Sequence, residues 1–223
     1  MGDVRGLTEQ LSEPDVGNPI HIRHRGRLIP QDLANSIIDW TFVARSGAVP
    51  EDGRVAELGA GYGRLIYVFA EDGGGPYCIF DVPPALAVAQ WYLSAVLGPH
   101  RVRQYMPGHD VSIVEPQLAP DVDAFFTPDQ IDMFPDGWFD ITQSISTLPG
   151  MPAAQSAHYL KVLAVKSRGA VFLKQSRHWR NPADNTQLSE HNYALPPPWR
   201  LATRRVDPVQ TALFNHLWLR PPA

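Results

Sequence analysis

The ten residues Val55-Ala-Glu-Leu-Gly-Ala-Gly-Tyr-Gly-Arg64 decide the fold of this chain. The apolar residues that precede the first glycine predict a short buried strand over 54–58, and apolar residues at helical spacing predict a helix over 62–70. Three glycines alternate with other residues between them: Gly59, Gly61 and Gly63. A glycine turn between a strand and a helix is typical of the nucleotide-binding corner of an open α/β sheet, where the backbone turns sharply and a ligand can approach it.

The spacing and the charge of this corner distinguish two classes of ligand. A dinucleotide site has the pattern G-x-G-x-x-G, whereas here the spacing is G-x-G-x-G and Arg64 stands at the third position. Glu57, two residues before the first glycine, would repel a pyrophosphate but attract the sulfonium and amino groups of S-adenosylmethionine (SAM). The corner therefore resembles the first motif of class I methyltransferases. A tight turn without a ligand is the alternative interpretation.

Composition indicates one soluble domain. The 223 residues can bury a single ample core, and a hydrophobic content of 44% with 19% charged residues is ordinary for a globular protein. A formal net charge of −4 disfavours nucleic acid as a partner, because phosphates require a basic surface. Cys78 is the only cysteine, which excludes a disulfide framework. Without a membrane-length apolar run or a secretory signal, we expect a cytoplasmic protein with no membrane partner.

The rest of the chain alternates predicted strands and helices. Strands are expected over 77–80, 122–126, 139–144 and 169–174, and helices over 30–45, 83–97 and 151–165. Two β-like runs, 201–206 and 212–219, fit a closing antiparallel hairpin. Loops are expected over 21–27 and 175–198, and residues 100–122 show no regular pattern. This order predicts an α/β fold with a mostly parallel seven-stranded sheet, a C-terminal antiparallel hairpin and helices on both faces.

Three further positions follow strands that would lie beside the glycine turn. Asp81 ends the strand over 77–80, where an acid accepts hydrogen bonds from ribose hydroxyls; the alternative is a helix N-cap. Thr127 would lie beside the adenine, with an ordinary turn residue as the alternative. Ser144 would lie beneath the methionine portion of the cofactor, with a plain strand-end residue as the alternative. An acid at Asp81 suits both dinucleotides and SAM, so it predicts a nucleoside without choosing between them.

Longer stretches resemble the bacterial SAM-dependent sugar O-methyltransferases. The similarity runs through Gly17-Asn-Pro19, residues 26–36, VAELGAGYGRL, YCIFDVPPALAVAQWYL and FFTPDQIDMFPDGWFDITQSISTLPGMP, and so covers most of residues 11–175. It implies a Rossmann-like class I methyltransferase fold, with an N-terminal cap and helix over 1–50 and the methyltransferase domain over 51–223. The run Ser144-Ile-Ser-Thr-Leu-Pro-Gly-Met151 departs from the Asn-Ser-Phe-Gln-Glu-Met-like run of the family, so no substrate contact is carried over there.

The resemblance also implies an activity and a cofactor. The expected reaction moves a methyl group from SAM to a hydroxyl of a sugar or short oligosaccharide, and a mannoside is the narrower hypothesis. The motif and the resemblance together predict a set of cofactor-binding residues: Glu57, Gly59, Ala60, Gly61, Gly63, Asp81, Val82, Thr127 and Ser144.

The chemistry of this reaction points to candidate acceptor residues. Methyl transfer is an in-line displacement, so the protein mainly positions the acceptor, and a base removes the hydroxyl proton. Histidine suits this task near neutral pH. His178 is the first candidate base and His191 the second, with a solvated loop histidine as the alternative for each. Asn18, Trp179 and Tyr193 are candidate acceptor contacts, although aromatic residues here could also pack the loop onto the sheet.

Several alternatives stay open at the level of sequence. Asp140, Asp184 and Glu190 could bind a divalent ion, but their spacing does not demand one. An NAD-dependent oxidoreductase is one rival function, disfavoured by Arg64 and Glu57; a catalytically inactive methyltransferase fold that binds cofactor or a partner is another. Nucleic-acid amino-group methyltransferases carry Asn/Asp-Pro-Pro-aromatic after strand four, which this chain lacks. The oligomeric state is open, with a homodimer as one option.

Overall fold

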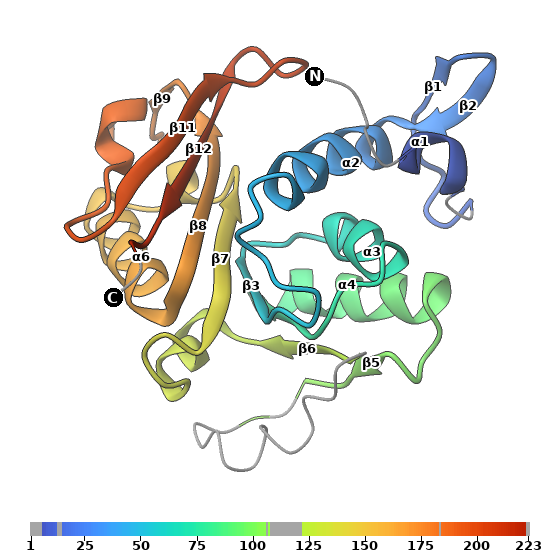
Figure 1. Ribbon diagram of the computed structural model, residues 1–223, viewed down its shortest axis with the longest axis horizontal. Helices are drawn as coiled ribbons and strands as arrows, with labels where there is room; N and C mark the ends of the chain where they lie inside the picture. The colour runs from blue at the N-terminus through green and yellow to red at the C-terminus, as the bar shows by residue number, and fades with distance from the viewer. Residues whose placement is uncertain (1–5, 13–14, 106, 108–121, 183, 222–223) are drawn as a thin grey trace.

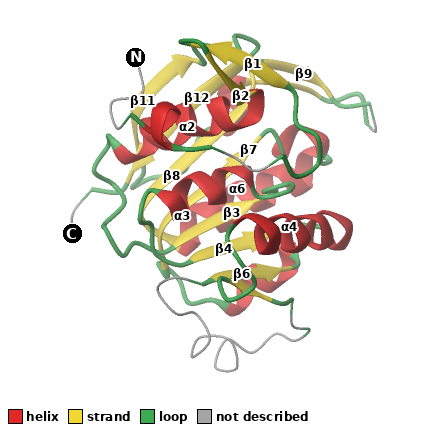
Figure 2. Ribbon diagram, turned by 90° about the vertical axis from the view of Figure 1, so that its right-hand side faces the viewer, coloured by secondary structure: helices red, strands yellow, loops and turns green. Residues whose placement is uncertain are grey.

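The protein, seen in a computed structural model, is built on one twisted sheet between two layers of helices (Figures 1 and 2). The structure describes residues 6–12, 15–105, 107, 122–182 and 184–221. Within them the sheet contains β3 (Val55–Leu58), β4 (Tyr77–Phe80), β5 (Val102–Arg103), β6 (Asp123–Phe126), β7 (Phe139–Ile145), β8 (Ser167–Ser176), β11 (Arg200–Val206) and β12 (Leu213–Leu219). Their spatial order is β11-β12-β8-β7-β3-β4-β6-β5. Neighbours from β8 to β5 are parallel, whereas β12 runs antiparallel to both β8 and β11.

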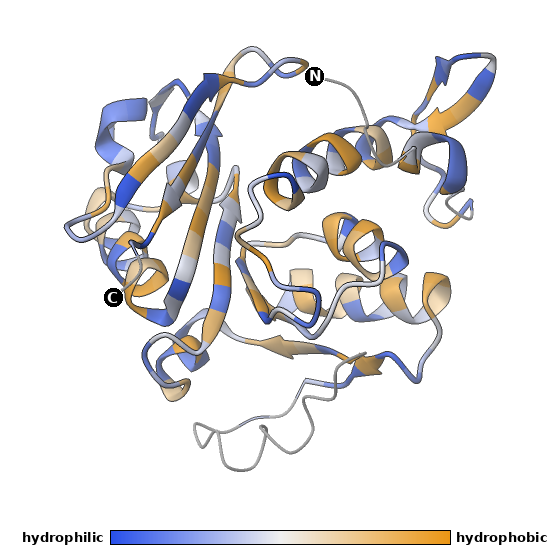
Figure 3. Cartoon of the chain, viewed as in Figure 1, coloured by the Kyte–Doolittle hydropathy of each residue, from blue (hydrophilic) through white to orange (hydrophobic). Residues whose placement is uncertain are grey.

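Helices cover both faces of the sheet. The helices α2 (Gln31–Ala44), α3 (Arg64–Glu71) and α4 (Pro83–Val96) lie on one face, and α6 (Ala153–Lys166) lies on the other (Figure 1). Strands buried on both faces are largely apolar, as β6 is in Figure 3, because each successive side chain enters the opposite core. In β4, Ile79 belongs to the core beneath α3, whereas Phe80 belongs to the core that includes Leu163 of α6. None of the described helices is long and apolar enough to cross a membrane.

The expected strands of the main sheet and the helices that cover it are confirmed, with one short addition to the sheet. All seven expected strands are present, and the two-residue β5 adds an eighth at the sheet edge. The helix after the glycine turn begins at Arg64 rather than at 62, because Gly63 still has the left-handed φ of 89° that ends the turn. Most of the irregular stretch 100–122 lies outside the described residues.

Two stretches expected as loops contain hairpins instead. The first pairs β1 (His21–His24) with β2 (Arg27–Pro30), and the second pairs β9 (His178–Arg180) with β10 (Gln187–Ser189). Arg25 and Gly26 both have positive φ, as a two-residue type I′ turn requires. This turn is difficult to recognise from the sequence, because Arg25 stands where asparagine or aspartate is usual. The strands of the second hairpin are only three residues long, too short for an alternating pattern to be visible.

The N-terminal segment packs onto the first core. Leu7 of α1 (Leu7–Gln10) and Leu11 are buried there. The Arg27 guanidinium of the β1–β2 hairpin donates to the Thr8 carbonyl oxygen at 2.9 Å and to that of Leu11 at 3.2 Å. These bonds satisfy carbonyl groups at the end of α1 and so fix the hairpin to the body of the protein.

A buried ionic cluster connects α2 to the C-terminal strands. Lys174 Nζ of β8 lies 2.9 Å from both carboxylate oxygens of Asp39 and 3.2 Å from Asp207 Oδ2. All three side chains are almost fully buried. Burial raises the pKa of Asp39 to about 6, although the lysine opposes that rise. Such a cluster holds α2 in one place, because separating its members would leave uncompensated buried charge.

Candidate functional site

The glycine turn lies at the carboxyl end of β3 and is left-handed at all three glycines. A Cβ atom added to Gly59 would lie 2.0 Å from Thr147 Oγ1, so this position must be glycine for the turn to pack against the chain after β7. A Cβ added to Gly61 would meet open space. The turn is therefore tightly packed below and open on its outer side, where a ligand can approach the backbone.

Asp81 closes the turn from the neighbouring strand. Its Oδ2 accepts a hydrogen bond from the Gly61 N–H at 2.9 Å, and its Oδ1 accepts one from the Val82 N–H at 2.7 Å. Val82 rather than Asp81 is the N-cap of α4, so the helix-capping interpretation of Asp81 was wrong. A carboxylate has about four acceptor positions. The two that remain can receive ribose hydroxyls, so Asp81 and the turn fit a nucleoside.

Glu57 lies below the turn rather than on its surface. It is 3% exposed, and its Oε2 accepts a hydrogen bond from the Tyr77 hydroxyl at 2.5 Å. Gln143 Nε2 donates to the same hydroxyl oxygen. Burial raises the pKa of Glu57 to about 7, while the hydrogen bonds from Tyr77 and Gln143 lower it in part. The sequence places Glu57 beside the turn, but it gives no signal for this chain of contacts across three strands.

The end of β7 contains one expected site residue, Ser144, and the chain after it supplies two residues that the sequence analysis missed. Ser144 is fully buried, and its carbonyl oxygen and hydroxyl accept hydrogen bonds from Gln175, so its side chain does not reach the edge of the sheet. Thr147 does reach the turn, because its hydroxyl donates to the Gly59 carbonyl oxygen at 3.1 Å. The exposed Ser146 between them has a φ of 56°. Non-glycine residues in this conformation are strained, and they gather at functional sites.

Thr127 follows β6, the next strand beyond β4. It is the N-cap of the short 3₁₀ helix η2 (Pro128–Met133), and Gln130 Oε1 accepts a hydrogen bond from its backbone N–H at 2.8 Å. This agrees with the interpretation of Thr127 as a turn residue. Its part in adenine binding stays a prediction.

The β9–β10 hairpin presents a polar face beside the end of β8. His178 pairs with Ser189, and Arg180 pairs with Gln187, so these four side chains project from one face. They border a hollow of about 430 Å³ together with Leu188 and Trp179, whose side chain is 41% exposed. In the described part of the chain, His178 and Arg180 form no side-chain hydrogen bond or ion pair. Both are therefore free to bind a ligand.

The other candidate acceptor residues divide between surface and core. Tyr193 is 1% exposed and packs against Phe214, so its ring is not available to stack on a sugar, and the packing interpretation was the right one. Burial raises the pKa of its hydroxyl to about 12. His191, in the 3₁₀ helix η4 (Glu190–Tyr193), is exposed. Asn18 is exposed too, in a turn with a φ of 51°.

The three candidate metal ligands lie apart, and each has a partner. Asp140 Oδ1 accepts from Arg168 Nε at 2.7 Å, and its Oδ2 accepts from the Arg54 N–H at 2.9 Å, at the opposite edge of the sheet from the glycine turn. Asp184 accepts from the Thr186 N–H at 2.9 Å, and Glu190 forms an ion pair with Arg204. Among the described residues, no three histidine, cysteine or acidic side chains gather as metal ligands.

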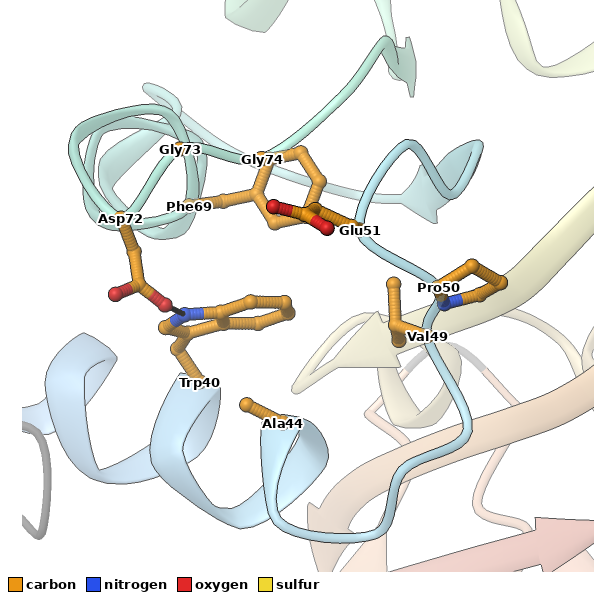
Figure 4. A pocket seen from close by; sticks show the side chains of 9 residues that line it. All are labelled: Trp40, Ala44, Val49, Pro50, Glu51, Phe69, Asp72, Gly73 and Gly74. Atoms are coloured by element: carbon orange, nitrogen blue, oxygen red, sulfur yellow. Dashed lines mark hydrogen bonds between the residues drawn. The ribbon is translucent and has the colours of Figure 1, made fainter.

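A second hollow, of about 370 Å³, lies at the amino ends of the strands (Figure 4). It is bordered by Trp40 of α2, by Glu51 before β3 and by Phe69 and Asp72 at the end of α3. The Trp40 indole N–H donates to Asp72 Oδ2 at 2.5 Å. Because the glycine turn lies at the other edge of the sheet, this hollow is separate from the candidate site.

The strand order and the glycine turn define the class of fold as the Rossmann-like fold of class I methyltransferases. Magnesium protoporphyrin IX methyltransferase from Synechocystis PCC 6803, solved with bound SAM, is 15% identical, with a TM-score of 0.58 over 86% of this chain and 79% of its own. A SAM-dependent methyltransferase from Methanosarcina mazei is 13% identical, with a TM-score of 0.56 over 79% and 96%. The mitomycin 7-O-methyltransferase MmcR is 12% identical, with a TM-score of 0.54 over 86% and 58%. No protein-family model and no curated protein sequence matches the chain.

Proposed function

We propose that the protein is a SAM-dependent O-methyltransferase that acts on a hydroxyl of a sugar or short oligosaccharide. The observation that carries the proposal is the open glycine turn closed by Asp81, in a fold whose solved examples include proteins crystallised with SAM and with S-adenosylhomocysteine (SAH). In this proposal Gly61 receives the cofactor along its open side, and the free acceptor positions of Asp81 take the ribose hydroxyls. SAM supplies a methyl group made electrophilic by the sulfonium.

The sugar acceptor is supported by the sequence resemblance and by the β9–β10 hairpin. Trp179 offers an exposed aromatic surface for a pyranose ring, and Arg180 and Gln187 offer hydrogen-bonding groups for hydroxyls. His178 shares the face of Arg180 and Gln187, whereas Trp179 stands at the alternate position of β9 and borders the same hollow. His178 has no competing partner among the described residues, so it can accept the hydroxyl proton as the oxygen attacks. A mannoside stays the narrower hypothesis.

The test of the cofactor is calorimetric titration with SAH and, in parallel, with NADH. We expect SAH to bind and NADH not to bind. Asp81→Ala should weaken SAH binding by about 1–3 kcal/mol, the usual cost of leaving buried polar groups unpaired. Asp52→Ala is the control, since Asp52 is an exposed acid before β3. Tight NADH binding without SAH binding would replace the proposal with the oxidoreductase alternative.

A further inference from the structure

A chain of buried polar groups crosses three adjacent strands directly beneath the glycine turn. Gln143 of β7 donates to the Tyr77 hydroxyl of β4, which donates to the Glu57 carboxylate of β3. All three side chains are at most 3% exposed. In the described part of the chain, no lysine, arginine or histidine forms an ion pair with Glu57. The carboxyl group is therefore held only by neutral donors.

The charged groups around Glu57 do not supply the missing positive charge. Asp81, after β4, and Asp39, of α2, both act to raise the pKa of Glu57. Of the buried cations on the neighbouring elements, Lys174 of β8 is held by Asp39 and Asp207, and Arg64 of α3 donates to the Tyr62 hydroxyl. On α3, Tyr67 directs its hydroxyl to the Ser12 carbonyl oxygen. A buried carboxylate without a counter-ion is costly, so Glu57 is poised to gain or lose a proton.

The glycine turn brings the cofactor site within reach of this group. Gly59 is two residues from Glu57, so their Cα atoms are at most about 7.6 Å apart. SAM carries one more positive charge than SAH, because the sulfonium becomes a neutral thioether when the methyl group leaves. An added positive charge above the turn would favour the ionised form of Glu57, whereas a neutral thioether would not.

We propose that Glu57, held by the positioning residues Tyr77 and Gln143, distinguishes SAM from SAH by charge, with SAM binding releasing a proton from its carboxyl group. This inference rests on the proposed function only in taking SAM as the cofactor. The proton passes from the carboxyl oxygen to solvent when SAM binds and returns once SAH has replaced it. Loss of the sulfonium charge thereby weakens the hold on the product and favours its release.

The proposal makes the preference for SAM dependent on pH. Because the pKa of Glu57 is about 7, the carboxyl is mostly neutral at pH 6 and mostly ionised at pH 8. The ratio of SAM affinity to SAH affinity should therefore rise with pH across this range. Unit charges about 10 Å apart, at an effective dielectric constant of about 20, change an affinity by roughly tenfold, which sets the expected size of the rise.

The test is calorimetric titration of the full chain with SAM and with SAH between pH 6 and 8, in phosphate and in Tris. These buffers differ in ionisation enthalpy, so the difference in heat between them counts the protons released. We expect more proton release with SAM than with SAH in the wild type, and equal release in Glu57→Gln. Equal release in the wild type, or an unchanged difference in Glu57→Gln, would overturn the proposal. Binding of neither ligand would instead refute the proposed function.

Tyr77→Phe gives a second test that does not remove the acid. The Tyr77 hydrogen bond lowers the pKa of Glu57, so its loss should move the pH-dependent rise in the affinity ratio to higher pH. Tyr67→Phe is the matched control, because Tyr67 is equally buried but bonds to Ser12. A rise at the same pH in all three proteins would show that Tyr77 has only a packing role and would contradict the proposal.

Discussion

A substitution at Gly61 should affect cofactor binding much more than it affects the packing of the protein. Its φ of 58° suits glycine, but its missing side chain faces open space. Gly61→Ala should therefore cost only about 1–2 kcal/mol of folding free energy, the usual strain of a left-handed alanine. Its methyl group would meet the cofactor, so we expect SAH affinity to fall at least about tenfold, which corresponds to about 1.4 kcal/mol.

Gly73 provides the matched control for this substitution. It has a φ of 80°, and a Cβ added there also meets open space, but it lies beside the hollow in Figure 4 at the other edge of the sheet. Gly73→Ala should lose similar stability in urea denaturation and keep its SAH affinity. If the two variants lost affinity equally, strain in the fold rather than the ligand would explain the effect.

The candidate base is tested by comparing two histidines. His178→Ala should leave SAH binding intact and lower the rate of methyl transfer to a sugar acceptor by about 10²–10⁴-fold, the usual contribution of general base catalysis. His191→Ala should keep most of the activity, because His191 lies in η4 and not on the polar face of the β9–β10 hairpin. If His191→Ala lost activity instead, the two roles would be exchanged. If neither mattered, a carboxylate such as Asp184 or Glu190, or a metal-bound hydroxyl, would be the next candidate base, and positioning alone would be left only if those acids and a chelator also had no effect.

The residues of the site differ in how far the sequence predicts them. The glycines and Asp81 are predictable, because backbone conformation and strand ends leave a local signal. Tyr193 and Ser144 lie in the core, where pairing of distant strands, invisible along the chain, decides which side a residue faces. Thr147 could not be predicted for the same reason, because it donates a hydrogen bond to the Gly59 carbonyl oxygen, 88 residues away along the chain.

At the scale of elements, strand and helix positions follow from periodicity, but the two short hairpins do not. The β1–β2 hairpin matters for function, because the chain continues from it into α2, and Asp32 at the start of α2 accepts a hydrogen bond from Tyr62 of the glycine turn at 2.9 Å. We infer that the hairpin covers the acceptor side of the turn, as lids do when they exclude water.

Replacing both Arg23 and His24 with alanine tests this cap. Both side chains are exposed and form no hydrogen bond or ion pair with other described residues, so stability should not change. SAH affinity should also stay constant, while the KM for the sugar acceptor should rise several-fold. Arg200→Ala, at an exposed arginine of β11, is the control. An unchanged KM in the double variant would show that the hairpin does not contact the acceptor.

At the scale of the whole molecule, two buried acids make stability depend on pH. Burial raises the pKa of Glu57 from 4.5 to about 7 and that of Asp39 from 3.8 to about 6. Between about pH 4 and pH 7 these two acids bind more protons in the folded protein than in the unfolded chain, so their contribution lowers the free energy of unfolding as pH rises. His216 opposes this trend below about pH 6.5, because burial lowers its pKa from 6.5 to about 4. Glu57→Gln should remove the larger part of the fall caused by these two acids. Its free energy of unfolding should therefore rise by about 2–3 kcal/mol relative to that of the wild type as the pH is raised from 5 to 8. Urea denaturation of both proteins at pH 5 and at pH 8 measures this change. If the free energies of unfolding of the wild type and the variant differed by the same amount at both pH values, the raised pKa of Glu57 would be contradicted.

The two edges of the sheet also affect how one molecule meets another. An open edge offers unpaired backbone groups to which a second copy could add strands, which leads to aggregation. At one edge β5 is only two residues long, and at the other β11 carries Arg200, Arg204 and Arg205. A very short edge strand and positively charged side chains on an edge are both features that disfavour pairing between sheet edges. We therefore expect any homodimer to use a helical face or a hairpin, which would leave the sheet of each subunit complete in itself.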